Sequence, residues 1–252
     1  MSVQALLEVR NLRKAFGGVV AVSDVSFDVA PGERIALIGP NGAGKTTCFN
    51  LINGQLTPDS GSIRLAGKSI AGLPAQRVAA LGVGRTFQTA AIFASMSVRE
   101  NVQLGLIAHA GQQWRLTARA GAAHVEAADA LLARVGAAAL AERTCATLAY
   151  GDLKRVELAV ALASSPRLLL MDEPTAGTAP ADRAQLMRLT MTLVRDDRMA
   201  ALFTEHDMDV VFAHADRVIV LDRGAIIAQG LPANVRADPR AQAAYFGADA
   251  EV

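Results

Sequence analysis

The fold of this chain is decided by one stretch, Gly39-Pro40-Asn41-Gly42-Ala43-Gly44-Lys45-Thr46-Thr47. The apolar run 34–38 precedes it, and residues 48–52 can continue it as a helix, which gives a strand, a glycine-rich turn and a helix. Glycines let the backbone curl so that successive N–H groups point at phosphate oxygens, helped by the positive end of the following helix. The stretch therefore predicts a loop that binds a nucleoside triphosphate.

Two side chains in this loop have predicted roles. Lys45 can reach the β and γ phosphates, and the Thr46 hydroxyl can hold a magnesium ion. The alternative is a glycine-rich turn that binds nothing. The lysine and hydroxyl at fixed offsets, with a strand before them, argue against it, and we take all of residues 39–47 as nucleotide-binding candidates.

Composition excludes several classes of protein. Lys and Arg total 25 against 24 Asp and Glu, for a formal charge of +1, so no broad basic surface for nucleic acid is expected. No run approaches the roughly 18 apolar residues of a membrane-spanning helix, and no secretory signal opens the chain, which places it in the cytosol with at most a peripheral membrane role. The two cysteines, Cys48 and Cys145, have neither disulfide nor metal-ligand spacing and are expected to be buried apolar residues.

The first half of the chain predicts a small sheet followed by a helical lobe. Residues 6–10, 19–29 and 62–67 are expected as strands, with the first two forming a small sheet before the phosphate loop. From about 97 to 162 the composition shifts to Ala, Leu, Arg and Glu, and residues 123–135 have helical spacing of apolar side chains. We expect a helical lobe inserted at 89–165, with a loop at 111–114 near its centre, in one domain spanning 1–252.

The second half predicts a parallel sheet. Strands at 168–171 and 200–203 alternate with a helix at 181–195, which is typical of a sheet with helices on both faces. Residues 217–221 and 225–228 form a closing hairpin, and the tail is expected as a short helical appendage. The predicted fold class is α/β, a phosphate-loop NTPase (RecA-like) core with an antiparallel β sub-sheet and the helical lobe.

A pair of acids should decide which phosphate-loop chemistry the chain performs. Asp172 follows an apolar run, where a buried central strand should end, and its carboxylate can bind magnesium directly or through water. Glu173 is expected to point the other way along the pleat, which suits a residue that orients or deprotonates an attacking water. Adjacent acids in a surface turn are the alternative, but the apolar run before them favours the functional interpretation.

With these residues in place, the chain resembles the ATP-binding subunit of ABC transporters over nearly its whole length. Further matches are Gln88 after Arg-Thr-Phe, the segment 148–152 (Leu-Ala-Tyr-Gly-Asp) at the start of a helix, and His206 after a strand. The resemblance implies ATP and Mg²⁺ as cofactors, with Gln88 at the magnesium as well as Thr46 and Asp172. It also implies that Ala149 and Gly151 cap the ATP held by a second cassette.

The signature segment departs from the family pattern. Ala149 lacks the hydroxyl of the signature serine, Tyr150 replaces a glycine and Asp152 replaces the glutamine. Because Gly151 and the helix N-terminus remain, we expect function with a clamp weakened or retuned by about 1 kcal/mol, the value of one neutral hydrogen bond. Ala179 stands where the family usually has an aspartate that communicates across the dimer, so cross-talk between the two sites is less firmly expected than ATP binding.

Finer features resemble the branched-chain amino acid importers and their amide and urea relatives. These are Arg-Thr-Phe-Gln at 85–88, the Leu-Ala-Tyr-Gly signature, Glu-His-Asp-Met at 205–208 and a tail ending Tyr-Phe-Gly. Spacing alone favours Phe16 as a core residue, but the resemblance makes it the ring that stacks on adenine. It likewise implies that His206 holds the γ-phosphate and the attacking water in line, beside Glu173 and Gln88.

The leading hypothesis is an ATPase that powers an importer for branched-chain or other amino acids from the cytoplasmic face of the membrane. Its implied partners are two permease subunits, which dock near Gln88, a second cassette, identical or homologous, and indirectly an extracytoplasmic solute-binding protein. The rivals are a soluble ABC ATPase of DNA repair or translation and a regulatory module that binds ATP without turnover. The chain lacks the paired cassettes, long coiled coil or basic insertions typical of the first rival, and Glu173 with His206 argues against the second.

Overall fold

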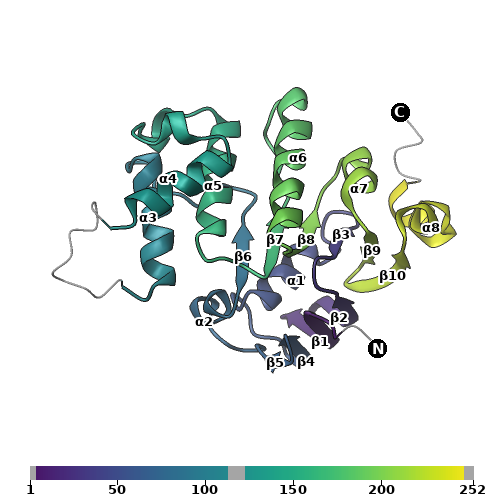
Figure 1. The fold of residues 1–252 in the computed structure, drawn as a ribbon. Coiled ribbons are helices and arrows are strands. Elements are labelled where there is room, and N and C mark those ends of the chain that lie inside the picture. The colour runs from purple at the N-terminus through teal and green to yellow at the C-terminus, as the bar shows by residue number, and fades with distance from the viewer. Residues whose placement is uncertain (1–3, 113–122, 247–252) are drawn as a thin grey trace.

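The computed structural model describes residues 4–112 and 123–246, which fold into two sheets and a helical lobe (Figure 1). Trp114 and Gly247, which belong to the loop and the tail expected above, lie outside the described residues. The predicted α/β fold with an antiparallel sub-sheet and a helical lobe is confirmed.

The smaller sheet is antiparallel, with the order β2-β1-β4-β5. Its strands are β1 (Leu7–Phe16), β2 (Val19–Val29), β4 (Ser60–Leu65) and β5 (Lys68–Ser69). β1 is longer than predicted because it pairs with β2 as far as Phe16 and Val19 and with β4 on its other edge. Of the four strands in this sheet, β1 and β2 precede the phosphate loop, and β4 and β5 follow it.

The larger sheet has the order β10-β9-β3-β8-β7-β6. β3 (Arg34–Ile38), β6 (Val83–Thr86), β7 (Leu168–Asp172), β8 (Ala200–Thr204) and β9 (Arg217–Asp222) are parallel, and β10 (Ala225–Gly230) closes the edge as the predicted hairpin. β7 and β8 are buried throughout, as expected for central parallel strands. The carboxyl ends of β3, β6, β7 and β8 thus meet at one edge, where ligands of open α/β sheets bind.

Alternation along β3 divides the core into two parts. Ile35 and Leu37 pack in the cluster that faces the smaller sheet and α1 (Lys45–Ile52), whereas Ala36 and Ile38 pack in the cluster that contains most of the other helices. Cys48 and Cys145 are both buried, as predicted. The sheet is therefore covered on both faces, which fixes the positions of the loops at its carboxyl edge.

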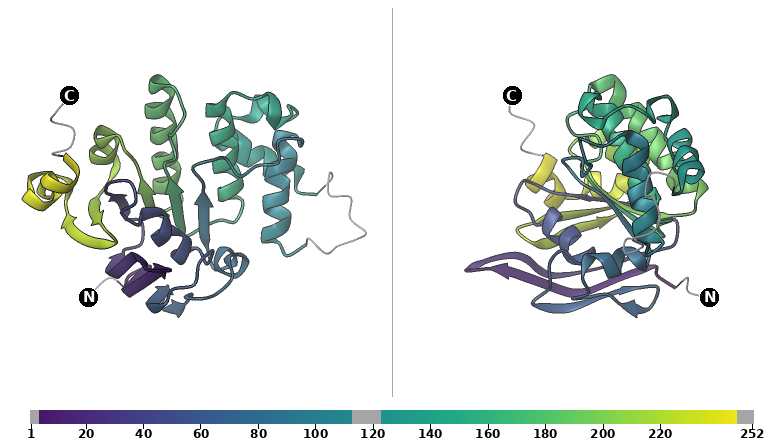
Figure 2. Two further views of the ribbon diagram at one scale, coloured as in Figure 1. Left: turned by 180° about the vertical axis from the view of Figure 1, so that it is seen from behind. Right: turned by 90° about the vertical axis from the view of Figure 1, so that its left-hand side faces the viewer.

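The remaining helices lie at the periphery of the large sheet or form the lobe. α2 (Ala75–Ala80) precedes β6, α6 (Pro180–Asp196) follows β7 and α7 (Met208–His214) follows β8. The tail forms α8 (Pro232–Ala237), α9 (Pro239–Ala241) and η4 (Gln242–Phe246). Figures 1 and 2 place α8 at the β10 edge, opposite the lobe.

The lobe contains α3 (Val98–His109), α4 (Val125–Arg134) and α5 (Tyr150–Leu162), with short turns η2 (Ala138–Leu140) and η3 (Cys145–Thr147) between the last two. It lies beyond β6 in both figures. A capping box of Ser97 and Glu100 begins α3. The boundaries of the lobe at 89 and 165 stay a prediction. Within 4–112 and 123–246, no helix is both long and apolar enough to cross a membrane.

Candidate functional site

The phosphate loop passes so close to two strands that two of its glycines, Gly39 and Gly44, have no room for a side chain. At Gly39, with φ 148°, a Cβ atom would lie 2.0 Å from the Leu221 carbonyl oxygen of β9. At Gly44, with φ 104°, it would lie 2.3 Å from the Ala21 carbonyl oxygen of β2. These two positions require glycine for conformation and for space, and they set the curl of the loop between β3 and α1.

Lys45 lies across this curl. Its Nζ donates hydrogen bonds to the carbonyl oxygens of Gly39, at 2.6 Å, and Pro40, at 3.0 Å. Burial lowers the pKa of Lys45, while the nearby carboxylates Glu173 and Asp172 act in the opposite direction. The ammonium is thus held at the carboxyl edge of the sheet, facing both predicted acids. Thr46, the predicted magnesium ligand, is exposed at the first turn of α1.

Asp172 ends β7, as predicted, and is buried. Its Oδ1 accepts a hydrogen bond of 2.9 Å from the Thr204 hydroxyl at the end of β8, and its Oδ2 lies 3.5 Å from Nη2 of Arg85 at the end of β6. Burial lowers the pKa of Arg85, and the charge of Asp172 opposes that shift. The carboxylate is therefore fixed in place by the two strands that flank β7.

Glu173 contacts both of the other predicted catalytic side chains. Its Oε2 accepts from Nε2 of Gln88 at 2.9 Å, and its Oε1 lies 2.7 Å from Nε2 of His206. Gln88 follows β6 and His206 follows β8, so three separate strands deliver the three groups. The structure brings together Gln88, Glu173 and His206 at one point, beside Lys45 and Asp172.

The expectation about how Glu173 is oriented is corrected. Sequence reasoning used the alternation of a strand, but β7 ends at Asp172 and Glu173 has a left-handed backbone with φ 49°. Its orientation comes instead from its backbone N–H, which donates to Thr204 Oγ1 at 2.9 Å, and from the contacts with Gln88 and His206. A non-glycine residue in this conformation is strained, and such strain often accompanies a functional position.

The oxygen donors fit a magnesium ion that is held mostly by its nucleotide. Among the described residues, no group of three or more His, Cys, Asp or Glu side chains could form a complete metal cage. Magnesium is usually bound through one or two carboxylates together with phosphate oxygens and waters. Asp172, with the Thr46 hydroxyl and the Gln88 amide oxygen, provides that kind of incomplete ligand set.

Sequence reasoning missed Glu205, the residue before His206. Its carboxylate is buried, and Oε1 accepts from the Thr175 backbone N–H at 3.1 Å and from the Thr175 hydroxyl at 2.6 Å. Burial raises the pKa of Glu205, the hydrogen bonds from Thr175 and His206 oppose this, and the negative charge of Glu173 adds to it. An acidic residue directly after the apolar strand β8 is the signal in the sequence that could have identified it. Glu205 ties the loop after β7 to the loop that carries His206.

The signature residues lie at the N-terminus of α5. Ala149 is the N-cap residue and offers no side-chain cap, as its missing hydroxyl predicts. Ala149 and Gly151 line a small pocket with Thr178 and Asp182, and no residue of 39–47 takes part in that lining. The role of Ala149 and Gly151 toward a second cassette stays a prediction.

Phe16 is at the end of β1 and is 48% exposed, so it is not the core residue that spacing alone favoured. Nζ of Lys14 lies 5.6 Å from the centre of its ring. An exposed aromatic ring is available to stack on a base, which is the role that the resemblance implies.

Comparisons with known proteins agree along the whole chain. The family model described as "ABC transporter" matches residues 22–176, and one described as "Branched-chain amino acid ATP-binding cassette transporter" matches residues 225–251. The chain is 37% identical to the "High-affinity branched-chain amino acid transport ATP-binding protein LivG" of Escherichia coli (strain K12), covering 97% of this chain and 98% of that protein. It is 36% identical to the "High-affinity branched-chain amino acid transport ATP-binding protein BraF" of Pseudomonas aeruginosa, covering 96% of this chain and 98% of that protein.

Solved structures give the same result. The fold matches the ADP conformation of MJ1267, an ATP-binding cassette of an ABC transporter, with a TM-score of 0.84 and 31% identity over 97% of this chain and 99% of that one. It also matches the ATP-binding cassette MJ0796, in a dimeric post-hydrolysis state bound to ADP and Pi, with a TM-score of 0.78 and 24% identity over 90% and 98%. The second likeness concerns the fold alone.

Proposed function

Because this chain belongs to the family of ABC transporter ATP-binding subunits, we propose that its ATPase activity powers the import of branched-chain or other amino acids. The single observation that carries the solute class is the likeness to LivG and BraF over nearly the full length of all three proteins. The match of residues 225–251 to the branched-chain family supports it independently of the ATPase core.

We infer the nucleotide-binding roles from the geometry of the loop. Residues 39–47 hold the phosphates, Lys45 contacts the β and γ phosphates, and Phe16 stacks on the adenine. Thr46, Asp172 and Gln88 provide oxygen ligands for Mg²⁺, which supplies charge neutralisation of the phosphates when bound. Asp172 suits this role because Thr204 and Arg85 already fix its carboxylate.

The hydrolytic step is assigned to the group around Glu173. A carboxylate there can accept a proton from a water that attacks the γ-phosphorus, and Gln88 and His206 hold that carboxylate from two sides. His206 can also donate to the γ-phosphate once Glu173 turns to the water. Electrostatic positioning of this kind supplies most of the catalysis in phosphoryl transfer.

The partners follow from the family and from the signature residues. Two cassettes, either two copies of this chain or this chain and a homologue, bind two ATP molecules between them, with Ala149 and Gly151 of each facing the nucleotide of the other. The pair sits on two permease subunits at the cytoplasmic face of the membrane, as a peripheral component. An extracytoplasmic solute-binding protein delivers the amino acid to the permeases.

Reconstitution tests the proposed transport function. The chain is co-expressed with the permease and cassette subunits proposed as its partners, purified as a complex and placed in liposomes with the solute-binding protein. We expect ATP-dependent uptake of radiolabelled leucine, isoleucine or valine, and no uptake with Glu173→Gln. ATP hydrolysis without uptake of any amino acid would contradict the proposed solute class while leaving the ATPase assignment intact.

A further inference from the structure

We propose that Tyr150, Lys154 and Glu157 of α5 form a clamp that positions Gln88 in the catalytic site. These three are positioning residues, since they act through Gln88. The inference rests on the role proposed above for Gln88. It links the signature helix, which serves the facing cassette, to the catalytic group of its own chain.

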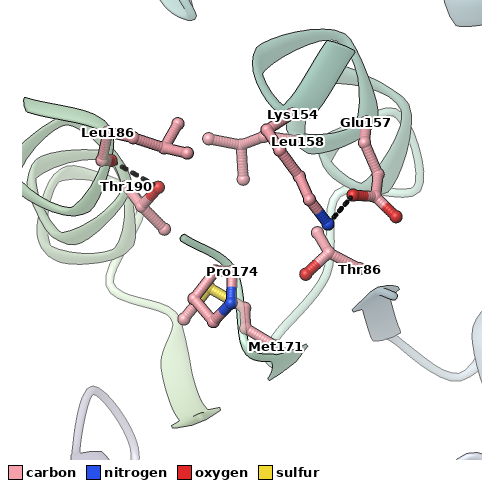
Figure 3. A pocket seen from close by; sticks show the side chains of 8 residues that line it. All are labelled: Thr86, Lys154, Glu157, Leu158, Met171, Pro174, Leu186 and Thr190. Atoms are coloured by element: carbon pink, nitrogen blue, oxygen red, sulfur yellow. Dashed lines mark hydrogen bonds and ion pairs between the residues drawn. The ribbon is translucent and has the colours of Figure 1, made fainter. Parts of the chain in front are cut away.

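The clamp is built on a buried ion pair. The side chains of Lys154 and Glu157 are 2% and 4% exposed, and Lys154 Nζ lies 3.1 Å from Glu157 Oε2 (Figure 3). Buried charges are costly unless they are paired and hydrogen-bonded, and an apolar pair of similar volume would often be as stable. Stability alone therefore does not explain this pair, and its other contacts indicate what it holds.

The other hydrogen bonds of the pair go to the backbone around Gln88, and Lys154 Nζ also lies 5.7 Å from the centre of the Tyr150 ring. Lys154 Nζ donates to the carbonyl oxygens of Phe87, at 2.5 Å, and Gln88, at 2.9 Å. Glu157 Oε1 accepts from the backbone N–H groups of Phe87, at 2.8 Å, and Ala91, at 3.3 Å. The chain is thus held on both sides of Gln88, while the exposed Gln88 side chain extends to Glu173.

Tyr150 adds a second attachment. Its hydroxyl donates to the Gln88 carbonyl oxygen at 2.9 Å. Its ring packs against Gly177, where a Cβ atom would lie 2.8 Å from Cε1 of the ring. The Tyr150 side chain therefore joins the start of α5 to two loops, the one with Gln88 and the one that follows Glu173.

The consequence concerns how the two ATP sites communicate. Gly151 lies one residue after Tyr150 and Lys154 lies one turn further along α5, so a shift of the helix N-terminus moves the Gln88 backbone with it. Tyr150 stands where the family signature has a glycine, which has no side chain to make these contacts. The tyrosine at this position of the signature provides this attachment.

Amide exchange tests the clamp in the isolated chain. Tyr150→Phe and the double variant Lys154→Met/Glu157→Leu are compared with wild type by hydrogen–deuterium exchange and thermal unfolding. In the double variant we expect the amides of Phe87 and Ala91 to exchange about 10- to 150-fold faster, because a bond to a carboxylate is lost, while the Tm stays close to that of wild type. Arg99→Met, which removes the ion pairs of Arg99 with Asp129 and Glu142 within the lobe, is the matched control and should leave both amides unchanged.

The amount of solute taken up per ATP hydrolysed, measured in the reconstituted transporter, shows whether Tyr150 positions Gln88 or only stabilises the fold. We expect Tyr150→Phe to lower the solute taken up per ATP hydrolysed by about 2- to 10-fold with the KM for ATP unchanged, and to have no further effect in Gln88→Ala. An effect of equal size with and without Gln88 would overturn the proposal, as would unchanged exchange at Phe87 and Ala91 in the double variant. Absence of uptake in the wild type would instead refute the import function, and the exchange data would still decide the clamp.

Discussion

Replacing Lys45 by Met should weaken the binding of ATP by a predictable amount. The ammonium has three N–H donors, and two of them bond to the Gly39 and Pro40 carbonyl oxygens. One donor thus remains for a phosphate without breaking either bond. Methionine loses the two internal bonds with or without nucleotide, so these losses cancel in the binding free energy.

What remains is one charge-assisted hydrogen bond, worth about 1.5–3 kcal/mol. At about 1.4 kcal/mol per factor of ten, the Kd for ATP should rise about 10- to 150-fold. Because the contact is to the β and γ phosphates, the Kd for AMP should hardly change. For ADP, which retains the β phosphate, the rise in Kd should lie between those for ATP and AMP.

Titration with fluorescent ATP, ADP and AMP analogues measures the three values. Lys68→Met, at an exposed lysine of β5, is the matched control and should bind all three as wild type does. If Lys45→Met weakens ATP and AMP by the same factor, the lysine supports the loop rather than the outer phosphates. Unchanged affinity for ATP would refute the assignment of the phosphate loop.

Three further predictions concern residues around the nucleotide. Gln88→Ala should leave the Kd for ATP nearly unchanged but lower the amount of solute taken up per ATP hydrolysed, and normal uptake in vesicles would contradict this. Phe16→Ala should raise the Kd for ATP about 2- to 12-fold, as expected for one lost aromatic contact of about 0.5–1.5 kcal/mol, whereas its removal would have no effect if the ring does not meet the base. Glu205→Gln should raise the Tm at neutral pH, because burial raises the pKa of Glu205 in the folded state. The stabilising contribution of Glu205 is therefore present below about pH 4.5, its ordinary pKa, and is lost as the pH rises through its folded-state pKa. The difference in Tm between Glu205→Gln and wild type should therefore shrink as pH falls toward 4.5, and a difference that grows on acidification would contradict the shift.

The sequence was most informative where a local pattern has one structural solution. The spacing of Gly39, Gly44 and Lys45 indicated the phosphate loop, because only glycine fits beside the Leu221 and Ala21 carbonyl oxygens. The apolar run before Asp172 indicated a buried parallel strand, because such strands are covered on both faces. Both motifs are short stretches of chain, so they could be recognised in the sequence without knowing which strands Gly39 and Gly44 contact.

Contacts between distant segments could not be predicted in this way. Glu173 leaves the strand in a left-handed conformation that the alternation of apolar residues cannot reveal, since Thr204, from another strand, stabilises it. Tyr150 was interpreted only by comparison with family patterns, because its bond to Gln88 spans 62 residues. Glu205 was overlooked beside His206 because its partner, Thr175, is 30 residues away.

The role of Glu173 in an ATP-dependent clamp of two cassettes is tested most directly by Glu173→Gln. The amide keeps the shape of the side chain but cannot accept the proton, so turnover should slow by about 10²- to 10⁴-fold with nucleotide binding intact. ATP should then be trapped between two cassettes, each capped by Gly151 and α5 of the other. Glu126→Gln, at an exposed position of α4, is the matched control and should hydrolyse ATP at the wild-type rate.

Size-exclusion chromatography of Glu173→Gln, alone and with a homologous partner cassette, is run in ATP–magnesium and then in ADP–magnesium. The expected result is a dimer in ATP that separates into monomers in ADP, together with the loss of phosphate release. A variant that hydrolyses ATP at the wild-type rate would refute the role of Glu173, and a slow variant that stays monomeric in ATP with either partner would contradict the clamp.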